Sequence, residues 1–185
     1  EIANAKNDLP SGIIIKVNSM VDPDLISLLY DASRAGVKIT LIVRGICCLI
    51  PGIEGVSENI TVISIVGQLL EHSRIFKFEN GGEPVVYIGS ADWMQRNLDK
   101  RVELVFPVED EDLKKRVFGM LDIMMNDTIN ARVQKSDMTY VMIDKRGKQP
   151  LNSQLEFYRL AKEALEEVKN DRQQPMFVPK ESENN

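Results

Sequence analysis

Three residues of this chain have the types and spacing to bind a phosphate group. His72, in the stretch GQLLEHSRIF, is the only histidine among the 185 residues, and Arg74 stands two positions after it. Arg44 directly follows the apolar run VKITLIV. Arginine presents a planar fork of donors that fits phosphate oxygens, and an imidazole can donate or accept a proton near neutral pH. A lone histidine is more often structural than catalytic, so the three indicate a phosphate site only if the fold brings them together.

The elements expected around Arg44 place it at the edge of a parallel sheet. Residues 11–17 (SGIIIKV) and 37–43 (VKITLIV) are β-branched apolar runs of strand length. Between them, Asp22 caps a helix that starts at Pro23 and ends at Gly36. One helical face carries apolar residues at Leu25, Ile26, Leu28, Leu29 and Ala32. The pattern predicts a right-handed β-α-β unit, and ligands gather beyond the carboxyl ends of such strands, where Arg44 lies.

His72 and Arg74 stand at the start of a predicted hairpin. The segments SRIFKF and VVYIG flank a turn at residues 80–82, and His72 immediately precedes the first segment. Because Arg74 follows His72 by two residues, we expect both side chains on one strand face. The segment GSADWMQRN, residues 89–97, adds small, polar and basic groups beyond the second strand, and Trp93 within it is interpreted as core or pocket wall.

The remaining elements complete an α/β fold, a mixed sheet flanked by helices. Further strands are predicted at residues 60–65, 101–108 and 138–143, and helices from residue 109 and from 151 to about 168. In the first of these helices the core positions are Leu113, Val117, Met120, Leu121 and Met124. Residues 45–59 form a loop without the Lys-Ser/Thr ending of a P-loop. We expect residues 1–12 to be a leading segment, 13–168 a single α/β domain and 169–185 a loose tail.

Composition narrows the classes of function. The chain is 43% hydrophobic, enough for a core, and its net charge of −5 is spread along its length. Non-specific wrapping of nucleic acid or anionic membrane is therefore disfavoured. No apolar run approaches the ~20 residues of a membrane span, and no basic start followed by an apolar stretch marks an export signal in these residues. The chain opens at Glu1 without a methionine, so we expect a piece of a longer protein.

The two cysteines do not indicate a metal site or a cross-link. Cys47 and Cys48 are adjacent, and neighbouring residues cannot form an ordinary disulfide without strain. One histidine and one cysteine pair lack the spacing of zinc ligands. Both cysteines are therefore interpreted as small buried side chains in a reducing compartment.

Several long motifs resemble one family. LIVRGICCLIPG, LEHSRIF, SADWMQRNLDKRVE and KVNSMVDPDLISLLYDASRAG are closely similar to the C-terminal domain of bacterial polyphosphate kinase, over roughly residues 10–165. The resemblance implies reversible transfer of the terminal phosphate of ATP to inorganic polyphosphate, and a fold like that of phospholipase D. It also implies that this chain is the last of four domains, and that the phosphorylated histidine lies in the preceding one.

The resemblance also implies roles for individual residues. Arg44 and His72 match the family's ATP-contacting arginine and histidine, so Arg44 would clamp phosphate oxygens and His72 would stabilise or protonate the departing ADP. Arg74 would add positive potential. The ligands of Mg²⁺ would lie in the missing domains, so the isolated chain would be inactive. The implied partners are ATP or ADP, polyphosphate and the preceding domains, in the cytoplasm and without nucleic acid. A homo-oligomer and peripheral membrane association stay open.

Two departures keep alternatives open. Gln68 stands where the family commonly has a basic residue, which weakens that phosphate contact. The phospholipase D motif is degenerate, because Arg74 replaces its lysine, Glu79 replaces its aspartate, and the Gly-Ser pair at 89–90 comes too late. One alternative is a phosphodiesterase in which two chains pair their histidines across a dimer. Another is a purely structural or assembly domain.

Overall fold

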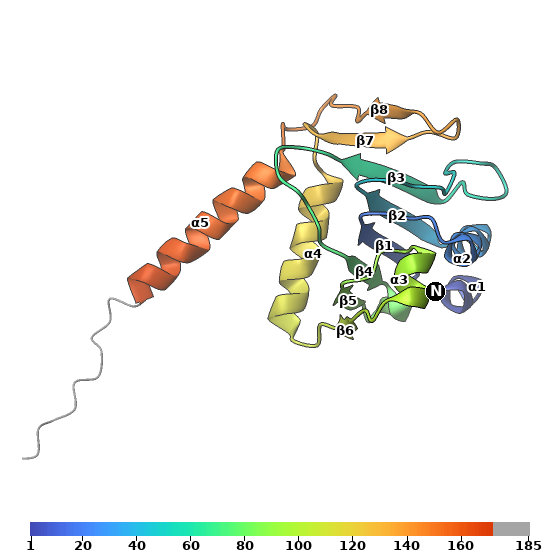
Figure 1. Cartoon of the computed structure of the whole chain (residues 1–185), viewed down its shortest axis with the longest axis horizontal. Helices are drawn as coiled ribbons and strands as arrows, with labels where there is room; N and C mark the ends of the chain where they lie inside the picture. Colours follow the sequence, from blue (N-terminus) through green and yellow to red (C-terminus); the bar gives the residue numbers. More distant parts are fainter. Residues whose placement is uncertain (172–185) are drawn as a thin grey trace, which may run out of the picture.

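Eight strands form one mixed sheet in the computed structural model, which describes residues 1–171 (Figure 1). The strands lie in the order β6-β5-β4-β1-β2-β3-β7-β8. β1, β2 and β3 are parallel, and every other neighbouring pair is antiparallel. Their bounds are β1 Gly12–Val17, β2 Lys38–Val43, β3 Ile60–Ile65, β4 Ile75–Phe78, β5 Val85–Gly89, β6 Val105–Pro107, β7 Ala131–Gln134 and β8 Tyr140–Met142. The predicted α/β fold with a mixed sheet is confirmed.

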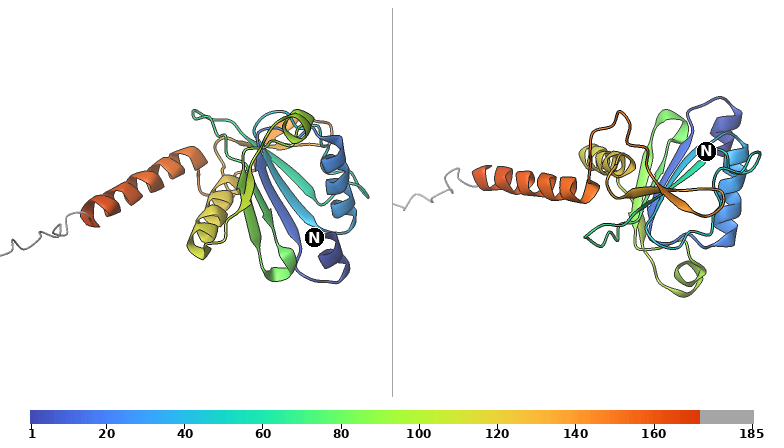
Figure 2. Two further views of the ribbon diagram at one scale, coloured as in Figure 1. Left: turned by 60° about the horizontal axis from the view of Figure 1, so that its bottom comes forward. Right: turned by 90° about the horizontal axis from the view of Figure 1, so that it is seen from above.

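Helices cover both faces of this sheet (Figure 2). α1 (Ile2–Lys6) and α2 (Pro23–Arg34) lie on one face, and α4 (Glu111–Met125) lies on the other. α5 (Ser153–Asp171) starts beside α4 and projects away from the sheet (Figure 1). Two further short helices are α3 (Gln95–Lys100) and the 3-10 turn η1 (Asn80–Gly82). Within residues 1–171 no helix is long and apolar enough to cross a membrane.

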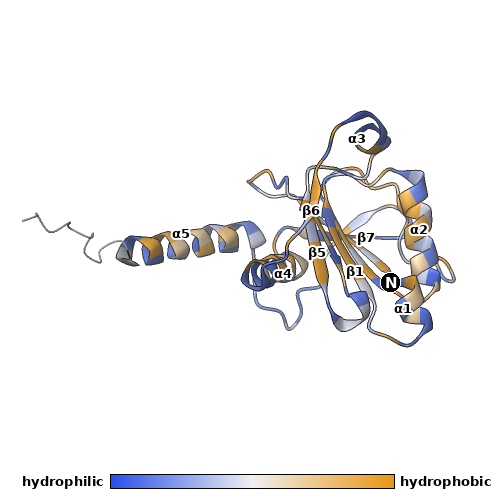
Figure 3. Ribbon diagram, turned by 90° about the horizontal axis from the view of Figure 1, so that it is seen from below, coloured by the Kyte–Doolittle hydropathy of each residue, from blue (hydrophilic) through white to orange (hydrophobic). Residues whose placement is uncertain are grey.

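Alternating side chains of the strands supply two apolar cores. Figure 3 shows the hydrophobic colouring of the sheet, with α1 and α2 on one side of it and α4 on the other. Ile15 and Val17 of β1 belong to the core under α2, whereas Ile42 of β2 and Ile75 of β4 belong to the core under α4. Leu121 and Met124 of α4 close the second core. Each fully buried aliphatic side chain contributes roughly 1.5–3 kcal/mol, so these cores fix the positions of the strand ends.

The predicted β-α-β unit forms as expected, with one error on its helix. Asp22 accepts a hydrogen bond from the backbone N–H of Leu25 at 3.0 Å, and Gly36 has a φ of 93° at the helix end. Ile26 and Leu29 are buried, but Leu28 is 57% exposed. Neighbouring helical residues point about 100° apart, so Leu28 cannot share the buried face with Leu29.

Other predictions are corrected in detail. Cys47 is buried but Cys48 is exposed, because successive residues of this extended segment point in opposite directions. Leu113 is exposed on the first turn of α4, and the burial of that helix centres on Leu121 and Met124. The strands predicted at 101–108 and 138–143 shorten to β6 and β8.

The two predicted ends of the chain differ in what the structure describes. In the leading segment 1–12, α1 forms, and the carboxylate of Glu1 accepts hydrogen bonds from the backbone N–H groups of Gly12 and Asn80. In the predicted tail 169–185, α5 continues to Asp171. Residues 172–185 lie outside the described part of the chain.

Candidate functional site

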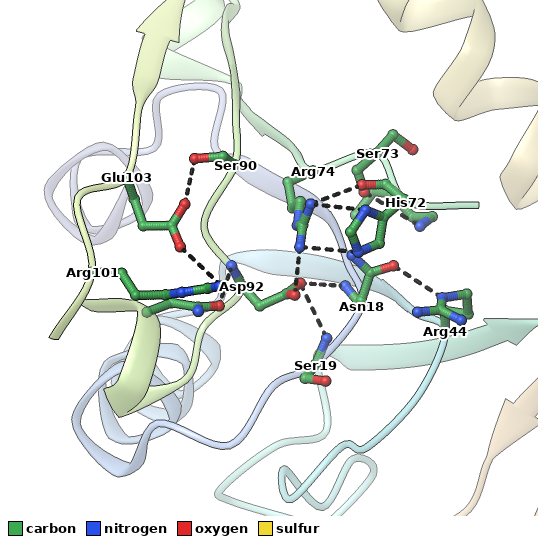
Figure 4. Close-up of polar contacts among 12 residues, drawn as sticks. Asn18, Ser19, Arg44, His72, Ser73, Arg74, Ser90, Asp92, Arg101 and Glu103 are labelled. Carbon is green, nitrogen blue, oxygen red and sulfur yellow. Dashed lines mark hydrogen bonds and ion pairs between the residues drawn. The ribbon is translucent and has the colours of Figure 1, made fainter. Parts of the chain in front are cut away.

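Four strands direct their neighbouring loops to one edge of the sheet. Asn18 follows β1 and Arg44 follows β2 at the carboxyl edge of the parallel strands. The register pairs Lys16 with Ile75, so antiparallel β4 begins at this same edge. β5 runs back beside β4 and ends there, before Asp92. The topology therefore gathers residues from four separate segments (Figure 4).

Backbone contacts join three of these loops. Met20 forms isolated β-bridges with both Cys47 and Trp93. The N–H of Gly45 donates to the carbonyl of Asn18 at 2.8 Å, and a Cβ at Gly45 would lie only 2.9 Å from that oxygen. Glycine is required for this close approach. The loop that carries Arg44 is thus held against the loop that follows β1.

A continuous chain of polar contacts links the side chains at this edge (Figure 4). The half-buried Arg44 donates from Nε to Oδ1 of Asn18 at 3.0 Å. The backbone N–H of Asn18 donates to Oδ1 of Asp92 at 2.7 Å, and Arg74 donates to Oδ2 of Asp92 at 2.9 Å. We call these residues, with His72, the edge cluster: Asn18, Arg44, His72, Arg74 and Asp92.

Arg74 lies against the ring of His72. Two guanidinium nitrogens are 3.4 Å from Nδ1 and 3.3 Å from Nε2, and one also donates to the carbonyl of His72 at 3.2 Å. The expected shared strand face is wrong, because β4 begins only at Ile75 and both residues lie in the preceding loop. The pair forms because the loop folds Arg74 back onto the ring. His72 itself is exposed at the edge.

Asp92 is a site residue that the sequence reasoning missed. Burial would raise the pKa of this carboxyl, but the hydrogen bonds from Arg74 and from the backbone of Asn18 and Ser19 outweigh burial and lower it. Gly89 of the Gly-Ser pair donates its backbone N–H to the carbonyl of Arg74 at 3.2 Å, so the pair lies at this edge of the sheet. A register fixed from the turn at residues 80–82 places Gly89 opposite Arg74, and Asp92 follows Gly89 by three residues in the loop beyond β5.

Lys16 was also missed, although it is the charged residue in the run SGIIIKV. Its side chain is 1% exposed and its Nζ donates to the carbonyl of Ser73 at 3.4 Å. A lysine in an apolar strand was the available signal, since lysine is almost never fully buried without a partner.

The other residues singled out from the sequence lie outside the edge cluster. Trp93 packs against the core as predicted and stacks on Phe76 with ring centroids 5.8 Å apart. Glu79 pairs with Lys77 at 3.1 Å in the hairpin, and no contact links it to His72. Gln68 is exposed and lines a cavity of about 720 Å³ beside the start of α5.

Two cavities flank the edge cluster without enclosing it. One of about 450 Å³ is lined in part by Arg74 and Ser73. The other, of about 520 Å³, is lined by Gly45 and Arg132, among others. Neither includes Arg44 or His72 in its lining. Arg44 is half-buried and His72 is exposed, so the part of the edge that carries these two residues is accessible to a ligand or to another domain.

Magnesium, which the family resemblance implies, does not fit the donors of the edge cluster. Mg²⁺ requires near-ideal octahedral coordination by oxygen ligands. Asp92, the carboxylate of the cluster, is already bonded to Arg74 and to two backbone N–H groups. Residues 1–171 contain no group of three or more His, Cys, Asp or Glu side chains that could hold a metal ion.

Comparison with known sequences identifies close relatives. A family model described as polyphosphate kinase C-terminal domain 2 matches residues 1–154. The polyphosphate kinase of Lactiplantibacillus plantarum is 52% identical over 165 residues, covering 89% of this chain and 23% of that protein. The Escherichia coli K12 polyphosphate kinase is 47% identical over 158 residues, covering 85% of this chain and 23% of that protein. The chain thus spans about a quarter of the length of these relatives.

Solved structures agree with this assignment. The crystal structure of polyphosphate kinase from Porphyromonas gingivalis matches with a TM-score of 0.85 and 41% identity, over 90% of this chain and 26% of that one. Nuc from Salmonella typhimurium, a phospholipase D family member, matches with a TM-score of 0.53 at 16% identity, over 73% of this chain and 89% of that one. The second likeness shows the fold alone. The chain belongs to the polyphosphate kinase family and corresponds to its C-terminal domain 2.

Proposed function

We propose that this chain is the ATP- and phosphate-binding C-terminal part of a polyphosphate kinase, which reversibly transfers the terminal phosphate of ATP to polyphosphate. The observation that carries the proposal is the edge cluster. It places Arg44, Arg74 and His72 at one open edge, connected through Asn18 and Asp92. The family membership of the chain supplies the reaction.

Arg44 is suited to hold phosphate oxygens. Its Nε is fixed by Asn18, while its two terminal nitrogens make no hydrogen bond within residues 1–171. The fork is therefore oriented before the ligand arrives. Phosphoryl transfer depends mainly on positioning and on neutralising charge, so a fixed guanidinium at the phosphates serves both needs.

His72 is suited to act on the leaving group. Its ring is exposed at the edge, and Arg74 lies along both ring nitrogens. In the proposed reaction a histidine of the preceding domain attacks the γ-phosphate, and His72 donates a hydrogen bond or proton to the departing ADP. Arg74, held by Asp92, adds positive potential next to the ring.

The open edge supports the proposal that a partner domain completes the site. Arg44 and His72 line none of the flanking cavities, so this chain supplies one wall of a site. We propose that the preceding domains of the same polypeptide supply the other wall, together with the phosphorylated histidine and the Mg²⁺ ligands. The isolated chain then binds nucleotide without turning it over. A cytoplasmic location stays a prediction.

Calorimetric titration of the purified chain tests this function. We expect a non-hydrolysable ATP analogue and tripolyphosphate to bind saturably, with no release of phosphate from ATP. Arg44→Ala should weaken binding about tenfold or more, because a hydrogen bond to a charged group contributes roughly 1.5–3 kcal/mol. Arg34→Ala is the matched control. It removes an arginine that pairs with Asp31 at the far end of α2.

Two other outcomes would replace the proposal. The likeness to Nuc motivates an assay with bis(p-nitrophenyl) phosphate. Hydrolysis of that diester, lost in His72→Ala, would indicate a phosphodiesterase that pairs two histidines across a dimer. If no phosphate ligand binds at all, the chain is a structural or assembly domain.

A further inference from the structure

Lys16 places a fully buried amine under the edge cluster. It lies on the α4 side of β1, between Ile42 of β2 and Ile75 of β4. The side chain is 1% exposed, among the most buried in the described chain. Burying an ammonium among aliphatic side chains is costly, so the position calls for a compensating partner.

The ammonium of Lys16 is only partly compensated by hydrogen bonds. An ammonium has three N–H donors, and the one hydrogen bond of Lys16 within residues 1–171 goes to the carbonyl of Ser73 at 3.4 Å. That carbonyl lies between His72 and Arg74 in the loop. Lys16 therefore contacts the segment that carries both phosphate-site residues, from the core side.

Other donors at the same edge also lack acceptors. The Nδ2 of Asn18 and the Nε of Arg74 are buried and make no hydrogen bond among the described residues. Asn18 follows Lys16 by two positions, in the loop directly after β1. Buried donors without acceptors are rare in native proteins, and each calls for a partner such as an ordered water or a bound ion. At an edge already lined by arginines, an anion is the fitting acceptor.

The charges around Lys16 are mixed. Burial is the main cause that lowers its pKa from the ordinary 10.5. The carboxylates of Glu71 and Asp92 oppose this effect, and the guanidinium groups of Arg44 and Arg74 add to it. A bound anion at the edge would favour the charged ammonium in the same way as the carboxylates do.

We propose that Lys16 is a positioning residue of the phosphate site. It holds the His72–Arg74 loop through the carbonyl of Ser73. Its positive charge, on the core side of the loop, strengthens the binding of phosphate oxygens. The inference rests on the proposed function, because it assumes that this edge binds phosphate. It adds a residue from the core of β1 to a site otherwise built from loops.

Lys16→Met tests the role with a side chain of similar length and no charge. We expect tripolyphosphate to bind Lys16→Met about tenfold more weakly than the parent chain, while Lys16→Arg keeps affinity within about threefold, where tenfold corresponds to 1.4 kcal/mol. Lys38→Met is the matched control, because Lys38 is exposed at the opposite end of β2. The melting temperature of each variant shows whether it is folded.

The pH dependence of affinity separates a charge effect from a purely structural one. In the parent chain, affinity for tripolyphosphate should fall as the pH rises through the lowered pKa of Lys16, because the ammonium loses its proton. Lys16→Met should lack this step. Glu71, Asp92, Arg44 and Arg74 face Lys16 in both proteins, so their contributions cancel in the comparison.

The outcomes distinguish the two proposals. If the parent chain does not bind tripolyphosphate, the proposed function is wrong and the role of Lys16 falls with it. If the parent binds and Lys16→Met binds equally well with the same pH profile, only the role of Lys16 is wrong. If Lys16→Met does not fold, the role of Lys16 is tested in the parent chain by an NMR titration of its pKa. A pKa of Lys16 that rises on saturation with tripolyphosphate supports the role, and an unchanged pKa overturns it.

Discussion

At the scale of single residues, the carboxylate of Asp92 connects the parts of the edge cluster. Asp92 joins the backbone after β1 to the guanidinium of Arg74, through contacts of 2.7 and 2.9 Å. Both side chains of this ion pair are largely buried. A partly buried pair of this kind costs more when one partner is removed than a surface pair does, since the remaining charge is left without compensation.

Asp92→Asn should lower the free energy of unfolding by about 1–3 kcal/mol at pH 7. The folded state lowers the pKa of Asp92 below its ordinary 3.8, so the contribution of the carboxylate is present above that pH and is lost as the pH falls below it. Urea unfolding at pH 7 and at pH 3 measures the difference between variant and parent. The gap should narrow at pH 3, and an equal gap at both values would contradict the assignment.

Sequence reasoning at this scale found residues whose positions depend on local pattern. Arg44 follows a strand of a β-α-β unit, so its place at the carboxyl edge could be predicted. Asp92 and Lys16 were missed because their roles depend on the pairing of β4 with β1 and β5. The pairing of β4 with β1 joins segments far apart in the chain, and no local period encodes it.

At the scale of elements, close loop packing at Gly45 fixes the position of Arg44. A Cβ at Gly45 would meet the carbonyl of Asn18 at 2.9 Å, whereas a Cβ at Gly119 on α4 would meet nothing within 4 Å. The two glycines therefore form a matched pair for substitution by alanine.

Gly45→Ala should destabilise the fold by about 1–3 kcal/mol, in the range of overpacking, and should weaken the binding of tripolyphosphate. Gly119→Ala should stabilise it by about 0.5–1 kcal/mol, because glycine is unfavourable within a helix. Chemical denaturation measures both changes. A Gly45→Ala chain as stable as the parent would contradict the close approach of the two loops.

The start of α5 holds the loop that leads to His72. Gln154 donates to the carbonyl of Leu69 at 2.8 Å and to Glu71 at 3.1 Å, and it accepts from the N–H of Leu69 at 2.9 Å. These contacts span two segments that lie far apart in the sequence. The helix thus positions the loop of the edge cluster from outside the sheet.

Gln154→Ala should free this loop. We expect the amide of Leu69 to exchange with solvent about 5–30-fold faster, which corresponds to one or two kcal/mol of lost local stability. Hydrogen exchange followed by NMR measures the rate. Gln149→Ala, at an exposed glutamine, is the control and should leave the rate unchanged. Equal rates in parent and Gln154→Ala would show that the contacts do not restrain the loop.

Element types were more predictable than their ends. The hydrophobic periods predicted the central strands, α2 and the hairpin, because each has its own local pattern. The loop conformation of His72 and Arg74 was not predicted, since β4 starts only where Ile75 enters the core. β6 and β8 are short edge strands whose residues are mostly exposed, so the apolar run at 101–108 overstated the length of β6.

At the scale of the whole molecule, the chain presents an open site and spans 23% of its Lactiplantibacillus plantarum relative. Motif resemblance predicted the family and the fold class from sequence. The order of the eight strands could not be predicted in this way, because strand order depends on non-local pairing. We propose that the open edge around Arg44 and His72 is one wall of a binding site that other domains complete.

The central claim is that Arg44 and His72 bind one phosphate ligand together. NMR titration of the chain with a non-hydrolysable ATP analogue tests it most directly, by following the Arg44 Nε–H and the His72 ring signals. The account predicts that both shift with one common dissociation constant, while Arg159 on the exposed face of α5 does not move. If the signals of Arg44 and His72 do not shift while those of remote residues do, the claim is contradicted.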